Sequence, residues 1–206
     1  MARFDLVPGR TALISVDLQN CFVADSPVAA PDGSKIVERL NRLAIALRQA
    51  GGKVIFTRHV VRPDGANTGI LGETIPAVKA GIINADAPSA QLHPSVDRRP
   101  GDIVLDKPQF GAFYGTDLEI ILRAKNLDTV IVGGIATNFC CETTAREAHA
   151  REFKVIFLSD GTATFDLPDT GMGPVSAAEA QRATCAVLGF GFAEVIRVDE
   201  AIARLR

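Results

Sequence analysis

Cys140 occupies a position in the sequence that favours nucleophilic chemistry. It follows the apolar run 129–132 and two turn glycines, Gly133 and Gly134, and it opens an alanine-rich stretch with helical spacing. A helix start presents unpaired backbone N–H groups and the positive end of the helix dipole, and both favour thiolate over thiol. Because the thiolate is the attacking form of cysteine, we expect Cys140 to have a lowered pKa and to act as a nucleophile.

Two charged residues close other predicted strands. Asp17 ends the apolar run 11–17, and Lys107 ends the run 102–107, where Pro108 keeps it extended. Right-handed crossovers bring the carboxyl ends of parallel strands to one edge of a sheet, which is where ligands bind. We therefore expect carboxylate, ammonium and thiol to meet there, although a lone strand-end aspartate is often a turn residue and a lone lysine is often solvated.

The elements that must position these residues alternate between short apolar runs and longer helical segments. This pattern predicts an α/β fold: one doubly wound, mostly parallel six-stranded sheet with helices on both faces, in a single domain over 1–206. The predicted strands are 11–17, 53–58, 102–107, 129–133, 154–159 and 193–198.

Helix and loop signals complete the predicted outline. Apolar residues at three- and four-residue steps mark a buried helix face over 36–47, and two segments, 116–119 and 176–179, have the S/T-x-x-E form of a capping box. The Gly- and Pro-containing segments 60–73 and 164–174 are predicted loops, long enough to cover a site.

Composition excludes several classes of partner. The net charge of −2 and the pI near 5.9 offer no basic cluster for nucleic acid or an anionic membrane. The start of the sequence is too polar for a signal peptide, and no apolar run reaches the roughly 18 residues of a membrane span. Because the 4 cysteines have neither zinc-site nor disulfide-scaffold spacing, we expect reduced thiols in a cytoplasmic protein.

Three segments resemble the isochorismatase-like cysteine hydrolases, a family that includes ureidoacrylate and N-carbamoylsarcosine amidohydrolases, biuret hydrolases and nicotinamidases. They are 14–20 (ISVDLQN), 106–118 (DKPQFGAFYGTDL) and 133–141 (GGIATNFCC). The resemblance implies a catalytic triad of Asp17, Lys107 and Cys140, with Cys140 rather than Cys141 in the family's nucleophile position. It also implies a thioester intermediate and a homo-oligomer, either dimer or tetramer.

The resemblance further implies a non-proline cis peptide between Ile135 and Ala136. The backbone N–H groups of Ala136 and Cys140 would then form an oxyanion hole. The run after Cys140 looks closest to the ureidoacrylate and N-carbamoyl branch, which implies a small amide, ureido or carbamoyl substrate.

Several residues are candidates for substrate contact, each with an ordinary structural alternative. An amide can brace a loop, a guanidinium can make a surface or subunit ion pair, an aromatic ring can fill the core, and a hydroxyl can bond back to its own helix. The candidates are Gln19, Arg58, Phe110, Phe113, Tyr114, Phe139, Thr143 and Thr144.

No cofactor and no metal site is expected. The family's nicotinamidases usually carry an Asp-x-His metal pair after the second strand, whereas this chain has Arg58 and His59 there without a matching carboxylate. The sequence thus predicts cysteine-dependent hydrolysis of a small non-peptide C–N bond. The alternatives are vinyl ether hydrolysis of the isochorismatase type, which needs no thiol, and a non-catalytic interaction or thiol redox-sensing domain.

Overall fold

A computed structural model describes residues 3–24 and 26–205; the remaining residues of the predicted domain, 1, 2, 25 and 206, lie outside the described part. Six strands form one sheet in the order β3-β2-β1-β4-β5-β6, and every pairing is parallel. The strands are β1 (Thr11–Val16), β2 (Lys53–His59), β3 (Ile103–Lys107), β4 (Thr129–Ile135), β5 (Lys154–Ala163) and β6 (Glu194–Ile196). The predicted doubly wound fold is confirmed, and the sheet is parallel throughout rather than mostly parallel.

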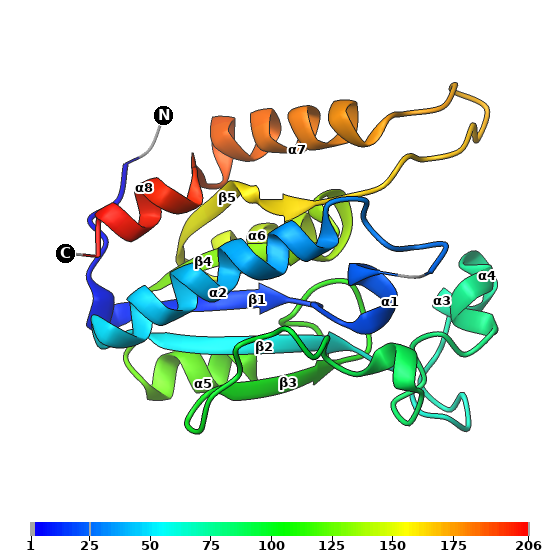
Figure 1. The fold of residues 1–206 in the computed structure, drawn as a ribbon, viewed down its shortest axis with the longest axis horizontal. Helices are drawn as coiled ribbons and strands as arrows, with labels where there is room; N and C mark the ends of the chain where they lie inside the picture. Colours follow the sequence, from blue (N-terminus) through cyan, green and yellow to red (C-terminus); the bar gives the residue numbers. More distant parts are fainter. Residues whose placement is uncertain (1–2, 25, 206) are drawn as a thin grey trace.

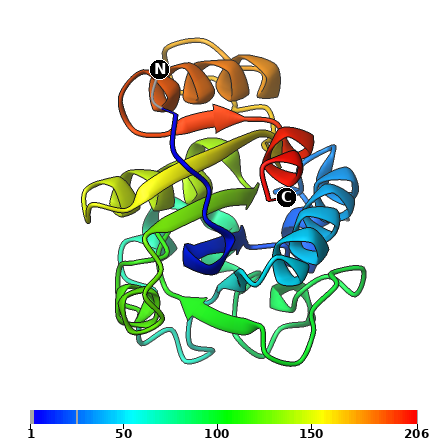
Figure 2. The same cartoon turned by 90° about the vertical axis from the view of Figure 1, so that its left-hand side faces the viewer.

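Helices cover both faces of the sheet, which explains why the central strands are apolar on both sides. The helices α2 and α8 pack on one face, and α5, α6 and α7 pack on the other (Figures 1 and 2). Every residue of β1 and β4 is buried between these layers. The helices are α1 (Asn20–Val23), α2 (Gly33–Gln49), α3 (Leu71–Thr74), α4 (Pro76–Lys79), α5 (Leu118–Ala124), α6 (Glu142–His149), α7 (Ala177–Gly191) and α8 (Val198–Ala203).

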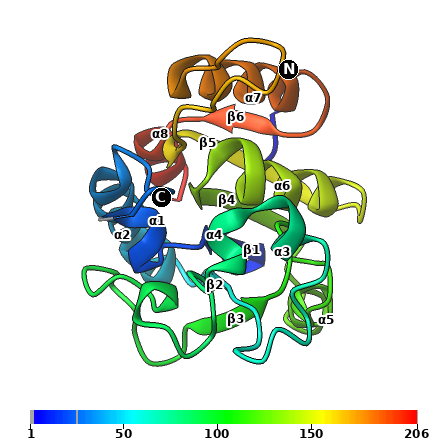
Figure 3. The same ribbon diagram turned by 90° about the vertical axis from the view of Figure 1, so that its right-hand side faces the viewer.

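Short helices close the edge of the sheet toward which all the strands point. There α1, α3 and α4 lie across the carboxyl ends of β1 and β2, as Figure 3 shows from that side. A separate apolar cluster that includes Cys21, Leu71 and Val78 holds these short helices together. The strand ends are therefore enclosed rather than open to solvent.

Some local predictions differ from the structure, and β4 and β5 run further than the predicted 129–133 and 154–159. Thr116 does not form the predicted capping box: its Oγ1 donates to the Ala112 carbonyl, and α5 has Asp117 at its N-cap without a side-chain cap. At the other predicted box, Ser176 and Glu179 do satisfy each other's backbone N–H groups. The last strand is shorter than predicted, because Val198 opens α8, whose first backbone N–H is capped by Asp160.

Within the described residues, no helix has both the length and the apolar character needed to cross a bilayer.

Candidate active site

Asp17 is the first residue beyond β1 and is completely buried. Its backbone turns sharply, with φ at 51°, in the left-handed region that aspartate tolerates better than most residues. The Thr57 hydroxyl fixes the side chain by donating to Oδ1 at 2.6 Å, and it accepts from the Asp17 N–H at 3.1 Å. Gly134 of β4 packs against the same turn, where an added Cβ would lie 2.0 Å from the Val16 carbonyl oxygen.

Lys107, at the end of β3, holds its ammonium in the centre of the site with no exposed surface. Its Nζ lies 2.8 Å from Asp17 Oδ2, and it donates to the Gln109 carbonyl at 2.9 Å and to Cys140 Sγ at 3.3 Å. Two of the three N–H donors of the ammonium are used in the bonds to Gln109 and Cys140. The Asp17 contact is an ion pair without hydrogen-bond geometry, so Oδ2 keeps capacity to accept another proton.

Cys140 faces Asp17 and Lys107 from beyond the end of β4, the strand that pairs with β1. It lies in the π-helical turn η3 (Thr137–Cys141) between β4 and α6, and a carboxylate oxygen of Asp17 is within 4.8 Å of its Sγ. Cys140 is 4% exposed and lines a cavity, whereas Cys141 has no exposed surface and belongs to the core under α6. The structure thus brings together Asp17, Lys107 and Cys140 as the sequence predicts, and it separates the two neighbouring thiols.

The predicted lowering of the Cys140 pKa is wrong in direction. Burial raises the pKa of the thiol, the Lys107 ammonium lowers it, and the Asp17 carboxylate raises it, so the net shift is upward. Cys140 therefore rests as a neutral thiol between an ammonium and a carboxylate. Burial lowers the pKa of Lys107, but Asp17 and Cys140 outweigh burial and raise it, which keeps the ammonium charged.

His59 is a site residue to which the sequence assigned no role. Strand β2 was predicted to end at Arg58 but continues one residue further, and His59 then pairs in register with Lys107. Its Nδ1 lies 4.0 Å from Cys140 Sγ. The strand-end rule that singled out Asp17 and Lys107 would have found His59 as well, had the strand boundary been placed correctly.

His59 is neutral in this site. Burial lowers its pKa to about 3, and the Lys107 ammonium contributes in the same direction. An unfolded histidine titrates near pH 6.5, so the unfolded chain binds a proton between pH 6.5 and about 3 that the folded chain does not. The contribution of His59 to folding stability is therefore fully present above pH 6.5 and is lost as the pH falls through this window.

We expect this effect to appear as a difference between the native protein and His59→Gln. From about pH 7.5 to about pH 5, the native protein should lose about 2 kcal/mol more of its free energy of unfolding than the variant, which lacks the titrating ring. Urea unfolding at the two pH values measures both losses. Equal losses in the two proteins would show that His59 is not held neutral.

An apolar cavity of about 360 Å³ opens beside Cys140. Aromatic rings of Phe22, Phe110, Phe139 and Phe165 line it, together with aliphatic residues around α4. The rings of Phe139 and Phe165 stack at 5.8 Å between centroids. Among the candidates for substrate contact, the structure thus places Phe110 and Phe139 at the cavity.

Two polar candidates lie outside the cavity and act within the protein. Gln19 is buried: its amide donates to the carbonyls of His59 and Ala90 and accepts from the His59 N–H. Arg58 makes a bidentate ion pair with Asp106, with both contacts at 2.7 Å, and donates to Gln91. Because these contacts occupy its guanidinium, Arg58 is not free to bind a carboxylate of the substrate in this structure.

The other candidates are also not among the described residues that line the cavity. Phe113 is buried against Phe153 in the core, and Thr144 is buried with its hydroxyl accepting from the Ala112 N–H. Tyr114 is 61% exposed and, with Thr143, borders a separate shallow depression. Core packing and backbone hydrogen bonding thus account for Phe113 and Thr144.

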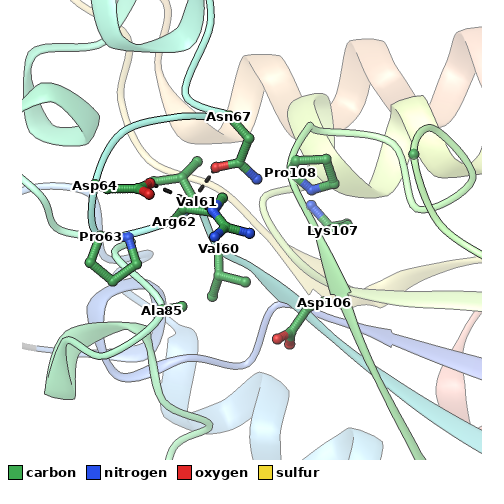
Figure 4. Close-up of a pocket in the computed structure, with 11 residues that line it drawn as sticks. Val60, Val61, Arg62, Pro63, Asp64, Asn67, Ala85, Asp106, Lys107 and Pro108 are labelled. Carbon is green, nitrogen blue, oxygen red and sulfur yellow. Dashed lines mark hydrogen bonds and ion pairs between the residues drawn. The ribbon is translucent and has the colours of Figure 1, made fainter.

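A larger cleft, of about 640 Å³, lies between the end of β3 and residues 60–67 (Figure 4). In this cleft the Arg62 guanidinium forms an ion pair with Asp64, and the Arg62 backbone N–H donates to the side-chain oxygen of Asn67. Lys107 borders this cleft but has no exposed surface, so the cleft does not open onto its ammonium. The predicted loop 60–73 therefore borders this cleft, while 164–174 contributes Phe165 and Pro168 to the wall beside Cys140.

Comparison with known proteins assigns the chain to a family. The model of the isochorismatase domain matches residues 11–200. The chain belongs to the isochorismatase family. A cysteine hydrolase from Pseudomonas syringae pv. phaseolicola has a crystal structure that matches with a TM-score of 0.93 and 39% identity, covering 98% of this chain and 95% of that one.

Curated relatives of this isochorismatase-family hydrolase include amidohydrolases. The ureidoacrylate amidohydrolase RutB of Methylorubrum extorquens is 33% identical in an alignment of 171 positions, which covers 74% of this chain and 69% of that protein. Nicotinamidase 3 of Arabidopsis thaliana is 33% identical over 190 residues, 92% of this chain and 85% of that protein. These relatives support hydrolysis of amide C–N bonds as the general activity.

The structure corrects one premise of the metal prediction for this isochorismatase-family chain. His59 does have a carboxylate beside it, since ligand atoms of Asp17, His59 and Cys140 all lie within 4.8 Å of one another. The Lys107 ammonium, however, contacts both Asp17 and Cys140 and would repel a cation held between them.

We accordingly expect activity without a metal ion. Ammonia release from an amide substrate should keep the same rate after dialysis against EDTA. A rate that falls on chelation and returns with a divalent cation would contradict this expectation.

Proposed function

We propose that the chain hydrolyses a C–N bond of a small amide, ureido or N-carbamoyl compound through a thioester on Cys140. The observation that carries the proposal is the position of Lys107 Nζ, which contacts both the Asp17 carboxylate and the Sγ of Cys140, a residue that lines the cavity. A base, a cation and a nucleophile within reach of one another are the parts that acyl transfer requires.

The first half-reaction begins from the neutral thiol. Asp17 accepts the Cys140 proton as Sγ attacks the substrate carbonyl carbon, so that no free thiolate need accumulate in the buried site. The N–H groups of Ala136, beside the Ile135–Ala136 cis peptide, and of Cys140 stabilise the oxyanion of the tetrahedral intermediate. Asp17 then returns the proton to the nitrogen, the C–N bond breaks, and ammonia or an amine leaves a thioester behind.

Water completes the second half-reaction. Asp17 accepts a proton from water as the oxygen attacks the thioester carbon, and the C–S bond breaks. The Lys107 N–H that points at Sγ stabilises the departing thiolate, which recovers its proton from Asp17. The products are the acid, or carbamate from a carbamoyl substrate, and the regenerated thiol.

Two other functions make different demands on the site. Vinyl ether cleavage proceeds by protonation and has no use for a thiol within 3.3 Å of an ammonium. A thiol redox sensor needs an accessible, low-pKa sulfur, whereas Cys140 is 4% exposed and burial raises its pKa. Amide hydrolysis uses each of the three groups in the observed arrangement.

A substrate panel tests the proposal. Simple amides, ureido acids, N-carbamoyl amino acids and isochorismate are incubated with the protein, and ammonia and pyruvate are measured. The proposal predicts ammonia from at least one amide, ureido or carbamoyl compound and no pyruvate from isochorismate. Pyruvate without ammonia would identify the vinyl ether reaction, and reversible oxidation of Cys140 without any turnover would identify a sensor.

A further inference from the structure

We propose that the substrate is an uncharged amide with an apolar body, bound in the cavity beside Cys140, rather than an amide that carries a carboxylate. The inference rests on the proposed hydrolytic function and narrows its substrate class. It separates this chain from enzymes that act on ureido acids, although the run after Cys140 looks closest to the ureidoacrylate and N-carbamoyl branch.

The lining of the cavity is apolar apart from two side chains. Phe110, Phe139 and Phe165 form one wall, and Val78 and Ile82 are among the aliphatic residues of another. Among the described lining residues, His59 and Cys140 carry the only polar side chains. A substrate body that fills this space exchanges water for aromatic and aliphatic contacts, which favours hydrocarbon over polar groups.

No cation is available in the cavity to pair with a carboxylate. The described lining residues include neither arginine nor lysine. Arg58, the sequence candidate for that role, is bound to Asp106 and Gln91, and the Lys107 ammonium is paired with Asp17. A carboxylate moved from water into this cavity would lose its hydration without gaining a partner, which is strongly unfavourable.

His59 does not supply the missing charge. Its burial holds the pKa at about 3, so the ring is neutral near pH 7. Its Nε2 is buried without a hydrogen bond of good geometry to the described residues, and a neutral imidazole has no positive charge to offset that of a carboxylate. The titratable groups at the cavity are thus His59 and Cys140, with Asp17 and Lys107 packed behind Cys140.

The same lining affects the product. Hydrolysis of an uncharged amide yields a carboxylic acid that ionises near neutral pH, and its charged form is poorly accommodated by the cavity. The site therefore accepts the amide and disfavours the acid, so product release is helped by the charge that the reaction creates.

A matched pair of amides tests the inference. 5-Methylhexanamide and glutaramate have the same chain of three methylene groups and differ at the far end, where one carries an isopropyl group and the other a carboxylate of similar size and branching. The carboxyl group of glutaramate has a pKa of about 4.3, so about one molecule in 1000 is protonated and uncharged at about pH 7.5. We expect only this uncharged form to enter the cavity. We expect kcat/KM for 5-methylhexanamide to exceed that for glutaramate by about 100- to 1000-fold.

The ratio of the two values has a predicted pH dependence. It should fall about tenfold for each pH unit from about pH 7.5 to about pH 5.5, as more glutaramate becomes protonated. Titration of enzyme groups common to both reactions cancels in the ratio. The variant Ile82→Arg places a cation in the cavity wall and should lower this ratio at least about tenfold. The control Ile82→Met also introduces a long side chain, but without a charge, and should leave the ratio unchanged.

The outcomes separate this inference from the proposed function. Equal values, a preference for glutaramate or a pH-independent ratio would overturn the inference and leave amide hydrolysis intact. If neither amide is hydrolysed, calorimetry with Cys140→Ala decides: tighter binding of 5-methylhexanamide supports the inference although the hydrolysis has failed. Failure of both compounds to bind, or tighter binding of glutaramate, would overturn it.

Discussion

Replacing Cys140 with alanine should lower kcat/KM for amide hydrolysis by at least about 1000-fold, the largest effect expected of any single substitution. Without the sulfur no thioester forms, and the remaining groups only bind and polarise the substrate. The protein should still fold, because the change removes a single sulfur atom at the edge of the cavity. Ammonia release under saturating and limiting substrate measures the loss.

Cys141 supplies the matched control for this experiment. It is adjacent in sequence and buried like Cys140, but its side chain belongs to the core rather than to the cavity. Cys141→Ala should retain kcat/KM within about threefold. Comparable losses in the two variants would show that the effect comes from disturbing η3 and not from removing a nucleophile.

Replacing Lys107 with methionine should cost about 3–5 kcal/mol of folding stability as well as activity. The ion pair between Lys107 and Asp17 has no exposed surface on either side chain, so removal of the ammonium leaves an uncompensated buried carboxylate. Urea unfolding of the native protein and the variant measures the cost.

A second substitution isolates the role of the charge. The double variant Lys107→Met with Asp17→Asn removes both charges and should recover most of the lost stability, yet remain inactive because the base is absent. The exposed pair Arg42–Asp199 provides a surface comparison, and Asp199→Asn should cost at most about 1 kcal/mol. A Lys107→Met cost no greater than that of Asp199→Asn would contradict the account of the buried pair.

The fold and the meeting of Asp17, Lys107 and Cys140 could be predicted because both depend on local sequence and on topology. Apolar runs identify parallel strands, and the right-handed crossover rule brings their carboxyl ends together. The residues that follow these strands are then predicted to be neighbours, provided that the last residue of each strand is assigned correctly. Strand β2 shows the limit: a boundary one residue short put Arg58 at the end and left His59 without a role.

Properties that depend on the surroundings of a side chain could not be predicted. A helix start favours thiolate over thiol, but desolvation of Cys140 by tertiary packing outweighs this effect and raises the thiol pKa. The sequence also does not show that the Arg58 guanidinium forms an ion pair with Asp106 on the neighbouring strand. The apolar cavity is assembled from Phe22, Phe110 and Phe165, which lie far apart in the chain.

The central claim is that Cys140 carries the acyl group during turnover. Rapid acid quench during hydrolysis of an amide, followed by peptide mass spectrometry, measures this directly. The account predicts that the peptide containing Cys140 gains the mass of the acyl group, with fragmentation placing it on Cys140 and not on Cys141. Steady turnover with the acyl group on another residue, or with the Cys140 peptide unmodified at every quench time and full activity in Cys140→Ala, would contradict it.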